Sequence, residues 1–359
     1  MKAIWHGVVV AERRAADLQA ELADQRDQWA TVHEQIAEAR GLTREELADR
    51  LVPDLGLDAT GSLTLDFGPR SFTVGFDEQL KPFVRDASGA RLKDLPKPGK
   101  TDDAEKAEAA AEQWKALKKD AKVASALQLM RLELAMCARR RWSPEVFRQF
   151  FVEHPLLIHG VRRLIWGTYS PEGALLSTFR VAEDRTLADV NEDPFTLPED
   201  AQVGLPHALE LDVKTAGAWG QVLADYQLPQ PFAQLGRPTH VPTDEEKTGL
   251  ELNRVAGLKR PTVQVLGLEA HGWRRGPPQD GGMVKWMEKP LGPQWLAELQ
   301  LEEGLSTGDV GETPEQTLGA VRVRPARQGW SAEHDRPLGA LDAVVFSELV
   351  HDLEGLRPA

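Results

Sequence analysis

Arginine and tryptophan are the residues of this sequence best suited to binding chemistry. A guanidinium group can meet a phosphate or a carboxylate through two parallel hydrogen bonds, and an indole ring offers a flat face for stacking. The segment 139–166 is rich in both residue types, and a further arginine follows at Arg237. The candidate binding surface consists of Arg139, Arg140, Arg141, Arg148, Arg162, Arg163, Trp166 and Arg237.

These cationic residues have three interpretations. The segment 183–212 carries nine acidic residues and one basic residue, whereas 97–141 carries 11 basic and seven acidic residues. The arginines could therefore pair internally with the acidic segment while the tryptophans pack in the core, which is the simplest interpretation. They could instead bind a protein partner or a nucleic acid.

A serine motif is the only pattern that indicates a nucleophile. Residues 304–308 match G-x-S-x-G, which in hydrolases places a serine at a sharp turn between a strand and a helix. Asp335 and His351 follow Ser306 in an order that would suit a catalytic triad. The residues after Gly308 show no helical periodicity and predict a loop. Ser306 is thus a candidate without the helix that the motif needs, and we expect no catalytic residues.

Metal and cofactor sites are not predicted. His154 and His159 are five residues apart, so they do not share a helix face as ligands at i and i+4 would. The acidic residues of 183–193 lack the spacing and the glycine of a calcium loop. Neither G-x-x-x-x-G-K-[ST] nor G-x-G-x-x-G occurs, and Cys137, the single cysteine, excludes an intramolecular disulfide.

Length and charge set the broad class. The chain has 359 residues, of which 41% are hydrophobic, which suffices for two or three domains with sizeable cores. A formal net charge of -13 argues against a polyanion-binding surface over the whole protein. No apolar run approaches the roughly 18 residues that span a bilayer, and the first ten residues lack a signal-peptide pattern. We expect a soluble, cytoplasmic protein.

The elements that must position these residues begin with helices. Apolar residues and Gln25 at 4-3-4-3-4 spacing from Leu18 to Ile36 predict a helix that ends near Gly41 and packs either against its own domain or against a partner helix. Thr43 and Glu46 form a capping box for the next helix. Apolar and polar residues then alternate over 62–92, which predicts a small antiparallel meander that must pack against another element.

A long helix with a basic polar face is predicted after about residue 103. Its buried face is expected to consist of Val123, Leu127, Met130, Leu134 and Cys137, which recur at 4-3-4-3 spacing, with Trp114 and Leu117 before them. Ser143 followed by Pro144 predicts another helix start.

Short strands dominate the rest of the prediction. They are expected at 176–181, 208–211, 262–268, 283–287, 296–301 and 318–323, with helices at 218–226 and 341–353. Because strands and helices are segregated rather than alternating, the sequence predicts an α+β fold.

The expected domains follow from this order. A helical N-terminal segment covers 1–57, and an α+β module covers 58–275. The module holds the meander at 62–92, a helical cluster at 103–169 and an acidic strand and loop region at 175–240. A β-rich segment with a final helix covers 276–359.

Several unusual segments occur together in an order typical of one family. They are LDFGPRSFTVGFDEQLKPFVRD at 65–86, LKDLPKPGKTDD at 92–103, RRWSPEVFRQFFVEHPLLIHGVRRLIWGTY at 140–169, FRVAEDRTLADV at 179–190 and QPFAQLGR at 230–237. Over about 61–273 the chain resembles the C-terminal module of the molybdate-metabolism-regulator-like (MolR-like) bacterial proteins, a module of unassigned function.

The resemblance implies a large, intracellular, multidomain bacterial protein, often with helical repeats and a tryptophan-glycine-arginine (WGR) domain upstream. It implies that genes for MoxR-type AAA+ ATPases and von Willebrand A-type proteins lie nearby, so these are the expected partners. It supplies no catalytic residues.

We interpret the sequence as a non-catalytic regulatory or scaffolding module that acts through protein contacts. No coherent catalytic set is present, no cofactor is expected, and ten tryptophans favour binding surfaces as well as cores. The alternatives are a nucleic-acid-linked regulator that uses the basic stripe of 139–163 and a hydrolase that uses Ser306.

Overall fold

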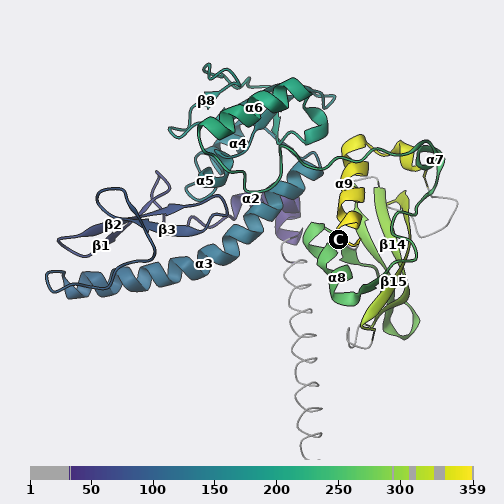
Figure 1. Cartoon of the computed structure of the whole chain (residues 1–359), viewed down its shortest axis with the longest axis horizontal. Helices are drawn as coiled ribbons and strands as arrows, with labels where there is room; N and C mark the ends of the chain where they lie inside the picture. The colour runs from purple at the N-terminus through teal and green to yellow at the C-terminus, as the bar shows by residue number, and fades with distance from the viewer. Residues whose placement is uncertain (1–31, 33, 293–294, 307–312, 327–335, 358–359) are drawn as a thin grey trace, which may run out of the picture. The chain divides into compact units, whose positions relative to one another are not determined.

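The computed structural model describes residues 32, 34–292, 295–306, 313–326 and 336–357 (Figure 1). The amphipathic helix predicted from Leu18 to Ile36 lies almost wholly outside the described residues. The chain divides into two compact units, one of residues 52–239 and one of 1–51 together with 240–359. Both contain helices and antiparallel sheets, so the predicted α+β class is confirmed.

The first unit begins with the predicted meander. Strands β1 (Leu63–Asp66), β2 (Ser71–Phe76), β3 (Pro82–Arg85) and β4 (Arg91–Leu92) form an antiparallel sheet in that order. The apolar residues of the alternating pattern are buried on one face, among them Leu65, Phe72 and Val74. This face packs on the long helix α3 (Ala104–Cys137), which supplies the second layer that a small sheet requires.

The buried face of α3 differs from the predicted one. Asp103 caps the helix, and the residues facing the meander are mainly alanines together with Trp114 and Leu117. Val123 and Leu127, which were predicted to be buried, are 70% and 47% exposed. Trp114 and Leu117 are buried as expected, but from Val123 onward the phase of the predicted face was wrong. Small alanine side chains allow the sheet to approach the helix closely, so the contact face carries few large hydrophobic residues.

The second sheet of this unit packs against an aromatic core. Its order is β5 (Arg141–Trp142), β9 (Gln202–Gly204), β6 (Trp166–Tyr169), β7 (Leu175–Val181) and β8 (Leu187–Ala188). Three short helices precede β6: α4 (Pro144–Phe147), the π-helix η1 (Arg148–Val152) and α5 (Ile158–Val161). The rings of Phe147 and Trp166 lie 4.6 Å apart at the centre of the core, and α6 (Val213–Asp225) adds Trp219 beside it.

One predicted strand of this unit is a helical turn. Residues 208–211 were expected to be extended, but Ala208–Glu210 form the 3₁₀ helix η2. The His207 side chain accepts a hydrogen bond from the Leu209 N–H, and the Glu210 carboxylate accepts one from the His207 N–H. These reciprocal caps favour a turn over a strand.

The second unit is a sheet covered by a helix. The sheet order is β10 (Glu251–Leu252), β15 (Glu315–Pro325), β14 (Trp295–Ser306), β13 (Met283–Pro290) and β12 (Arg274–Arg275), while β11 (Lys259–Pro261) also pairs with β15. The C-terminal helix α9 (Ala343–Glu354) packs Phe346, Leu349 and Leu353 onto this sheet (Figure 1). The remaining helical segments of the unit are α2 (Arg44–Arg50), α7 (Asp244–Thr248), η4 (Asp280–Gly282) and η7 (Leu338–Ala340).

Two predictions for this region need correction. Residues 262–268 were predicted as a strand but form α8 (Thr262–Leu266) and the start of η3 (Gly267–His271), because Val265 and Leu268 share a helical face turned into the core. The expected domain boundary after residue 275 lies inside a sheet, since β10, β11 and β12 pair with β13 and β15. Among the described helices, none combines the length and apolarity needed to cross a membrane.

Candidate functional site

The predicted arginine surface is divided among several places in the first unit. Arg139 and Arg141 leave the end of α3 and converge on one carboxylate, that of Glu210. The Glu210 Oε1 atom lies 3.3 Å from an Nη2 atom of each arginine. Glu210 belongs to the acidic segment 183–212, so part of the predicted cationic stripe is paired internally.

Glu210 is the centre of a largely buried polar network. Its side chain is 10% exposed, and its Oε2 atom accepts hydrogen bonds from the Tyr169 hydroxyl at 3.2 Å and the His207 N–H at 2.9 Å. The Arg141 guanidinium stacks 3.5 Å from the centre of the Tyr169 ring. Burial raises the pKa of the Tyr169 hydroxyl, so this group is a neutral donor at physiological pH. The network positions η2 against β6 and leaves no open carboxylate for catalysis.

Arg237 and Trp166 are buried and make contacts within the fold. The Arg237 guanidinium donates to Glu133 Oε1 at 2.7 Å and to Cys137 Sγ at 3.5 Å, with 3% of its side chain exposed. Trp166 is fully buried, and its indole N–H donates to the Val161 carbonyl at 2.9 Å. Neither side chain is available to a partner. Arg140 lies over the Trp142 ring at 5.0 Å, and Arg148 is exposed on η1.

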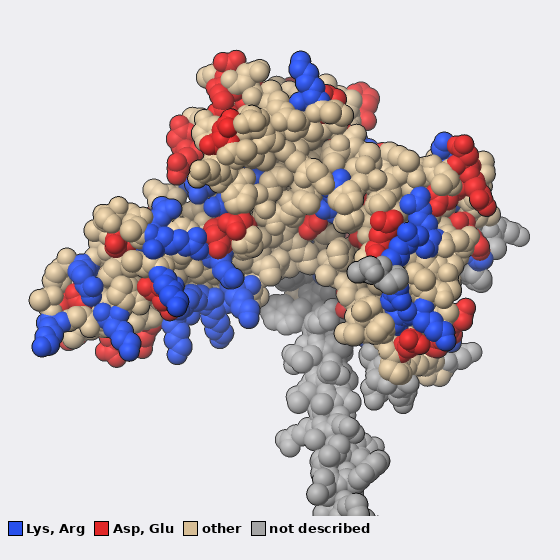
Figure 2. Space-filling model, in the orientation of Figure 1, with Lys and Arg blue, Asp and Glu red and all other residues tan. Residues whose placement is uncertain are grey.

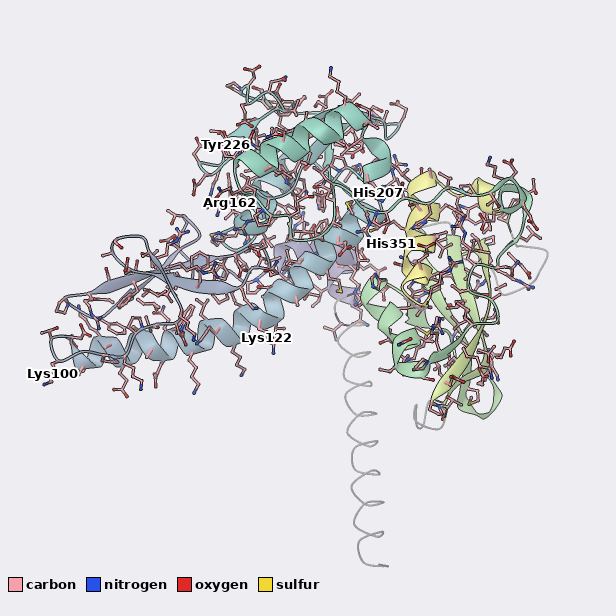
Figure 3. The ribbon with its side chains drawn as sticks, viewed as in Figure 1. Lys100, Lys122, Arg162, His207, Tyr226 and His351 are labelled. Atoms are coloured by element: carbon pink, nitrogen blue, oxygen red, sulfur yellow. The ribbon has the colours of Figure 1, made fainter. Side chains whose placement is uncertain are left out.

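Arg162 and Arg163 lie apart from the Glu210 network, after α5, where Figure 3 labels Arg162. The Arg162 Nη1 atom is 3.6 Å from Glu183 Oε1. Arg163 is 9% exposed and donates to the carbonyl oxygens of His159 and Phe76. Arg162 and Arg163 therefore do not share a buried carboxylate as the arginines around Glu210 do.

Ser306 lies at the end of β14, opposite Met283 of β13. The next described element is the strand β15, which pairs antiparallel with β14. A nucleophile elbow needs a helix directly after the serine, and residues 307–312, where that helix would begin, lie outside the described residues. Asp335, the carboxylate considered for a triad, lies outside the described residues.

The acidic residues of 183–193 mostly serve turns and ion pairs. Asp184 and Asp189 accept hydrogen bonds from backbone N–H groups two residues further along. Glu192 pairs with Arg180 at 2.6 Å and accepts from the Tyr226 hydroxyl at 2.8 Å. Among the described residues, no group of three or more His, Cys, Asp or Glu side chains is arranged to hold a metal ion.

A cationic and apolar surface on α3 was missed as a site by the sequence analysis. We call it the α3 face and define it by Lys115, Lys119, Lys122, Val123 and Leu127, all of them exposed. Spacing of four, three, one and four residues places them on neighbouring rows of one side of the helix. Lysine and arginine side chains gather along α3 in Figure 2, and Lys122 projects away from the meander in Figure 3.

The three lysines of the α3 face are unpaired. They make no hydrogen bond or ion pair with any residue that the structure describes, whereas the neighbouring Lys118 pairs with Asp94 at 3.1 Å. The charge of the α3 face is thus available to a ligand outside the chain. The sequence contained this signal as an excess of lysine in 97–141, but the five residues could be placed on one open surface only after the phase of α3 was known.

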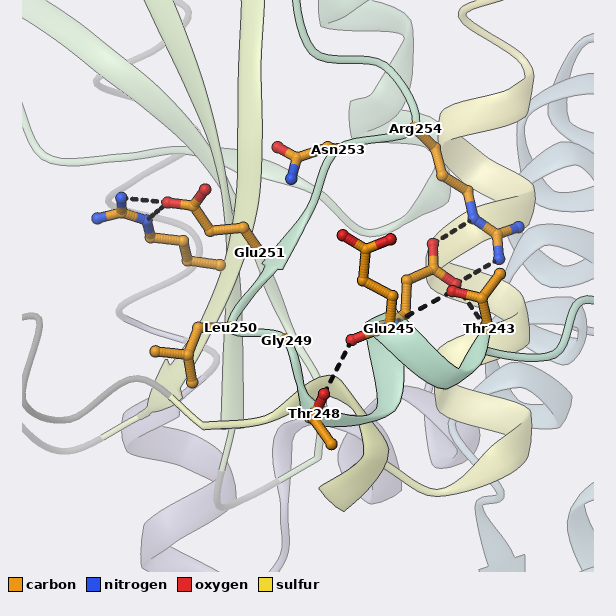
Figure 4. A pocket seen from close by; sticks show the side chains of 10 residues that line it. Thr243, Glu245, Thr248, Gly249, Leu250, Glu251, Asn253 and Arg254 are labelled. Atoms are coloured by element: carbon orange, nitrogen blue, oxygen red, sulfur yellow. Dashed lines mark hydrogen bonds and ion pairs between the residues drawn. The ribbon is translucent and has the colours of Figure 1, made fainter.

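A hollow of about 750 Å³ lies in the second unit (Figure 4). It is lined mainly by residues of α7 and of the segment that follows it to residue 254, including Glu245 and Asn253. Both arginines at its wall are already paired, Arg254 with Glu246 at 2.8 Å and Arg322 with Glu251. The Arg254 guanidinium lowers the pKa of the Glu246 carboxyl to about 2. The hollow offers hydroxyl, amide and carboxylate groups but no free cation or nucleophile that would indicate a reaction.

Comparison with known proteins gives a family without an assigned role. Residues 89–273 match the family model described as "Domain of unknown function (DUF4132)". The chain is 42% identical over 253 residues to the "Uncharacterized protein YehI" of Escherichia coli (strain K12). That match covers 70% of this chain and 21% of the relative, so the chain spans about a fifth of the length of the relative. No solved structure matches.

Proposed function

We propose, because the chain belongs to the DUF4132 family and the residues that the structure describes hold no catalytic constellation, that it is a non-catalytic regulatory or scaffolding module acting through protein contacts. The single observation that supports this proposal most directly is the α3 face. It combines three unpaired ammonium groups with two exposed aliphatic side chains on one helix.

The composition of the α3 face fits a protein partner better than a polyanion. Val123 is 70% exposed and Leu127 is 47% exposed, and apolar area of this kind is stabilised only when another apolar surface covers it. The lysines beside these two aliphatic residues would attract an acidic partner over long range and orient it as it docks. An acidic amphipathic helix would present both complements, with carboxylates opposite Lys115, Lys119 and Lys122 and aliphatic residues opposite Val123 and Leu127.

A nucleic acid is less well matched to this unit. Phosphates would pair with the lysines, but they would leave the aliphatic residues uncovered. Glu108 and Glu112 lie on the same side of α3, two turns and one turn before Lys115 respectively, and would repel a continuous polyanion. The arginines of the predicted basic stripe are dispersed, and those nearest its start are paired with Glu210.

The sequence resemblance suggests which proteins to test. We propose that the chain is a cytoplasmic, MolR-like module of the kind found downstream of WGR domains, and that its partners are a MoxR-type AAA+ ATPase and a von Willebrand A-type protein. The support for these partners is the gene context that the resemblance implies.

The proposal can be tested by direct binding. Purified chain would be immobilised, and a MoxR-type ATPase and a von Willebrand A-type protein from the same genome would be passed over it. The variant Lys115→Glu/Lys119→Glu/Lys122→Glu places carboxylates where the partner is expected to have its own, so we expect affinity to fall about tenfold or more and the on-rate to lose most of its salt dependence.

The matched control carries the same change of charge elsewhere. Lys93→Glu/Lys97→Glu/Lys100→Glu alters three exposed lysines of the loop before α3 and should bind as the wild type does. Equal binding by both triple variants would refute the role of the α3 face. Salt-sensitive binding of duplex DNA that is lost only in the first variant would favour the nucleic-acid alternative. Labelling of Ser306 by a fluorophosphonate probe would favour the hydrolase alternative.

A further inference from the structure

A second cationic cluster lies at the junction of α5, the meander and the turn between β7 and β8, all within residues 52–239. It contains Arg162 and Arg163 after α5, Arg85 at the end of β3 and Arg185 between β7 and β8. Arg85 acts electrostatically on Arg162, and Arg185 acts on His159. The cluster is separate from both the Glu210 network and the α3 face.

Arg163 is the fixed charge at the back of this cluster. Its guanidinium is nine-tenths buried, yet it bonds only to neutral carbonyl oxygens, those of His159 at 3.1 Å and Phe76 at 3.5 Å. Its Nε atom has no hydrogen-bond partner, and no carboxylate of the described residues lies within ion-pair distance. Burial lowers the pKa of Arg163 and repulsion from Arg162 lowers it further, while Glu78 and Asp77, which form no ion pair with it, act in the opposite direction. A buried guanidinium without a carboxylate in direct contact is only partly neutralised and leaves a positive potential in front of it.

Arg162 places a second positive charge next to Arg163 at the surface of the protein. Its side chain is 24% exposed, its Nε atom has no partner, and its nearest carboxylate, Glu183, is 3.6 Å away and 93% exposed. A fully solvated carboxylate at that distance is a weak counterion. Burial is also the main cause of the lowered pKa of Arg162. The guanidinium is therefore partly desolvated without adequate neutralisation.

His159 is the buried residue next to this arginine cluster. Its Nε2 atom lies 2.7 Å from the Gly61 carbonyl oxygen and so carries the proton in the neutral ring, while the buried Nδ1 atom has no partner. The imidazole is therefore neutral beside three guanidinium groups and does not supply a negative charge.

We propose that Arg162, backed by Arg163 and flanked by Arg85 and Arg185, is a binding site for a single phosphate group. A phosphate dianion presents several oxygens to guanidinium donors and carries the charge that Glu183 fails to supply. The site is not suited to a long polyanion, because Glu183 and Asp184 are exposed at its edge and the segment 183–212 is strongly acidic. The phosphate comes either free from solution or as a monoester on a partner chain.

Binding would be measured on the full chain with two probes, inorganic phosphate and a short phosphoserine peptide, at constant ionic strength. We expect saturable binding that Arg162→Gln weakens about tenfold or more, since one charge-assisted bidentate contact is lost. Arg148→Gln, which removes an exposed arginine of η1, should bind as the wild type does. Tighter binding of the peptide than of inorganic phosphate would identify a phosphorylated chain as the source, and equal binding would identify free phosphate.

Glu183→Gln provides an independent check, because it removes the competing carboxylate and leaves the core intact. We expect this variant to bind phosphate more tightly than the wild type. Arg162→Gln binding with wild-type affinity, or no saturable binding of either probe, would overturn the proposal. NMR gives a second readout: bound phosphate should raise the pKa of His159, whereas a purely structural role of Arg162 would leave that pKa independent of phosphate.

Discussion

The titration of His159 provides a quantitative test of the packing around α5. Its ring is 8% exposed, and burial lowers its pKa from 6.5 to about 4, with the charges of Arg162 and Arg163 contributing in the same direction. The folded chain therefore takes up the proton on His159 at lower pH than the unfolded chain does. Because the unfolded state binds the proton first, the stability that neutral His159 contributes is complete above about pH 6.5 and is lost as the pH falls towards 4.

The magnitude follows from the two pKa values. A difference of about 2.5 between 6.5 and about 4 corresponds to roughly 3 kcal/mol at full protonation of the unfolded state. Between pH 7.5 and pH 5.0 the same linkage gives a loss of about 2 kcal/mol in the free energy of unfolding from this residue alone. Carboxylates that titrate nearby change the total pH dependence, so the comparison must be made between two proteins.

The variant His159→Gln keeps a side-chain N–H that can donate to the Gly61 carbonyl and removes the titrating group. Urea unfolding of both proteins at pH 7.5 and pH 5.0 would give four free energies of unfolding. We expect the wild type to lose about 2 kcal/mol more than the variant over this interval. An equal loss in the two proteins would refute the reasoning, since it would mean that His159 takes up its proton equally readily in the folded and unfolded chains.

Further substitutions have outcomes set by local geometry. Glu210→Gln removes a carboxylate that both the Arg139 and the Arg141 guanidinium contact and should lower the free energy of unfolding by about 3 kcal/mol in urea titrations; a loss of less than about 0.5 kcal/mol would contradict the stabilising role of this network. Gly339→Ala should destabilise by about 1–3 kcal/mol because its Cβ atom would lie 2.5 Å from a backbone carbonyl oxygen, whereas Gly217→Ala, in open space within α6, should stabilise by about 0.5–1 kcal/mol in the same assay. Lys289→Met should cost about 3–5 kcal/mol by leaving the buried Asp352 carboxylate without its ammonium partner at 2.5 Å, and adding Asp352→Leu should recover only part of the loss, because the buried Trp273 indole N–H then loses its acceptor.

The parts of the fold that the sequence predicted correctly are those with local signals. The meander was readable because polar and apolar residues alternate over 62–92, and the start of α4 was readable from Ser143 and Pro144. The segments 208–211 and 262–268 were misassigned because a short apolar run has too few residues to separate a period of two from a period of 3.6. In both, capping and tertiary packing decided the outcome.

The phase of α3 could not be derived by ranking residues on hydrophobicity. Val123 and Leu127 are more apolar than the alanines that face the meander, yet the alanines are buried because the sheet lies close to the helix axis there. Burial in that interface depends on how closely two backbones approach, which the sequence pattern does not contain. The α3 face, the surface on which the proposed function rests, could therefore be identified only from the structure.

The distribution of the predicted arginine stripe over several places also depends on the path of the backbone, which the sequence pattern does not contain. Arg139 has a positive φ of 52°, which turns the chain at the end of α3 and directs Arg141 into β5. Arg162 lies beyond three short helices from that turn, so sequence proximity did not bring these residues to one surface.

Function depends on which cations the fold neutralises. Arg139 and Arg141 share one buried carboxylate with a tyrosine hydroxyl and a backbone N–H, so their charge is used within the fold. Lys122 is solvated and unpaired, whereas Arg162 is partly desolvated and poorly paired. A solvated lysine favours a broad, salt-sensitive protein contact. A partly desolvated arginine favours one discrete anion, because binding an anion replaces the hydration that the guanidinium has lost through burial. The same argument separates their expected salt responses: partner binding at the α3 face should weaken steeply as ionic strength rises, and phosphate binding at Arg162 should weaken less.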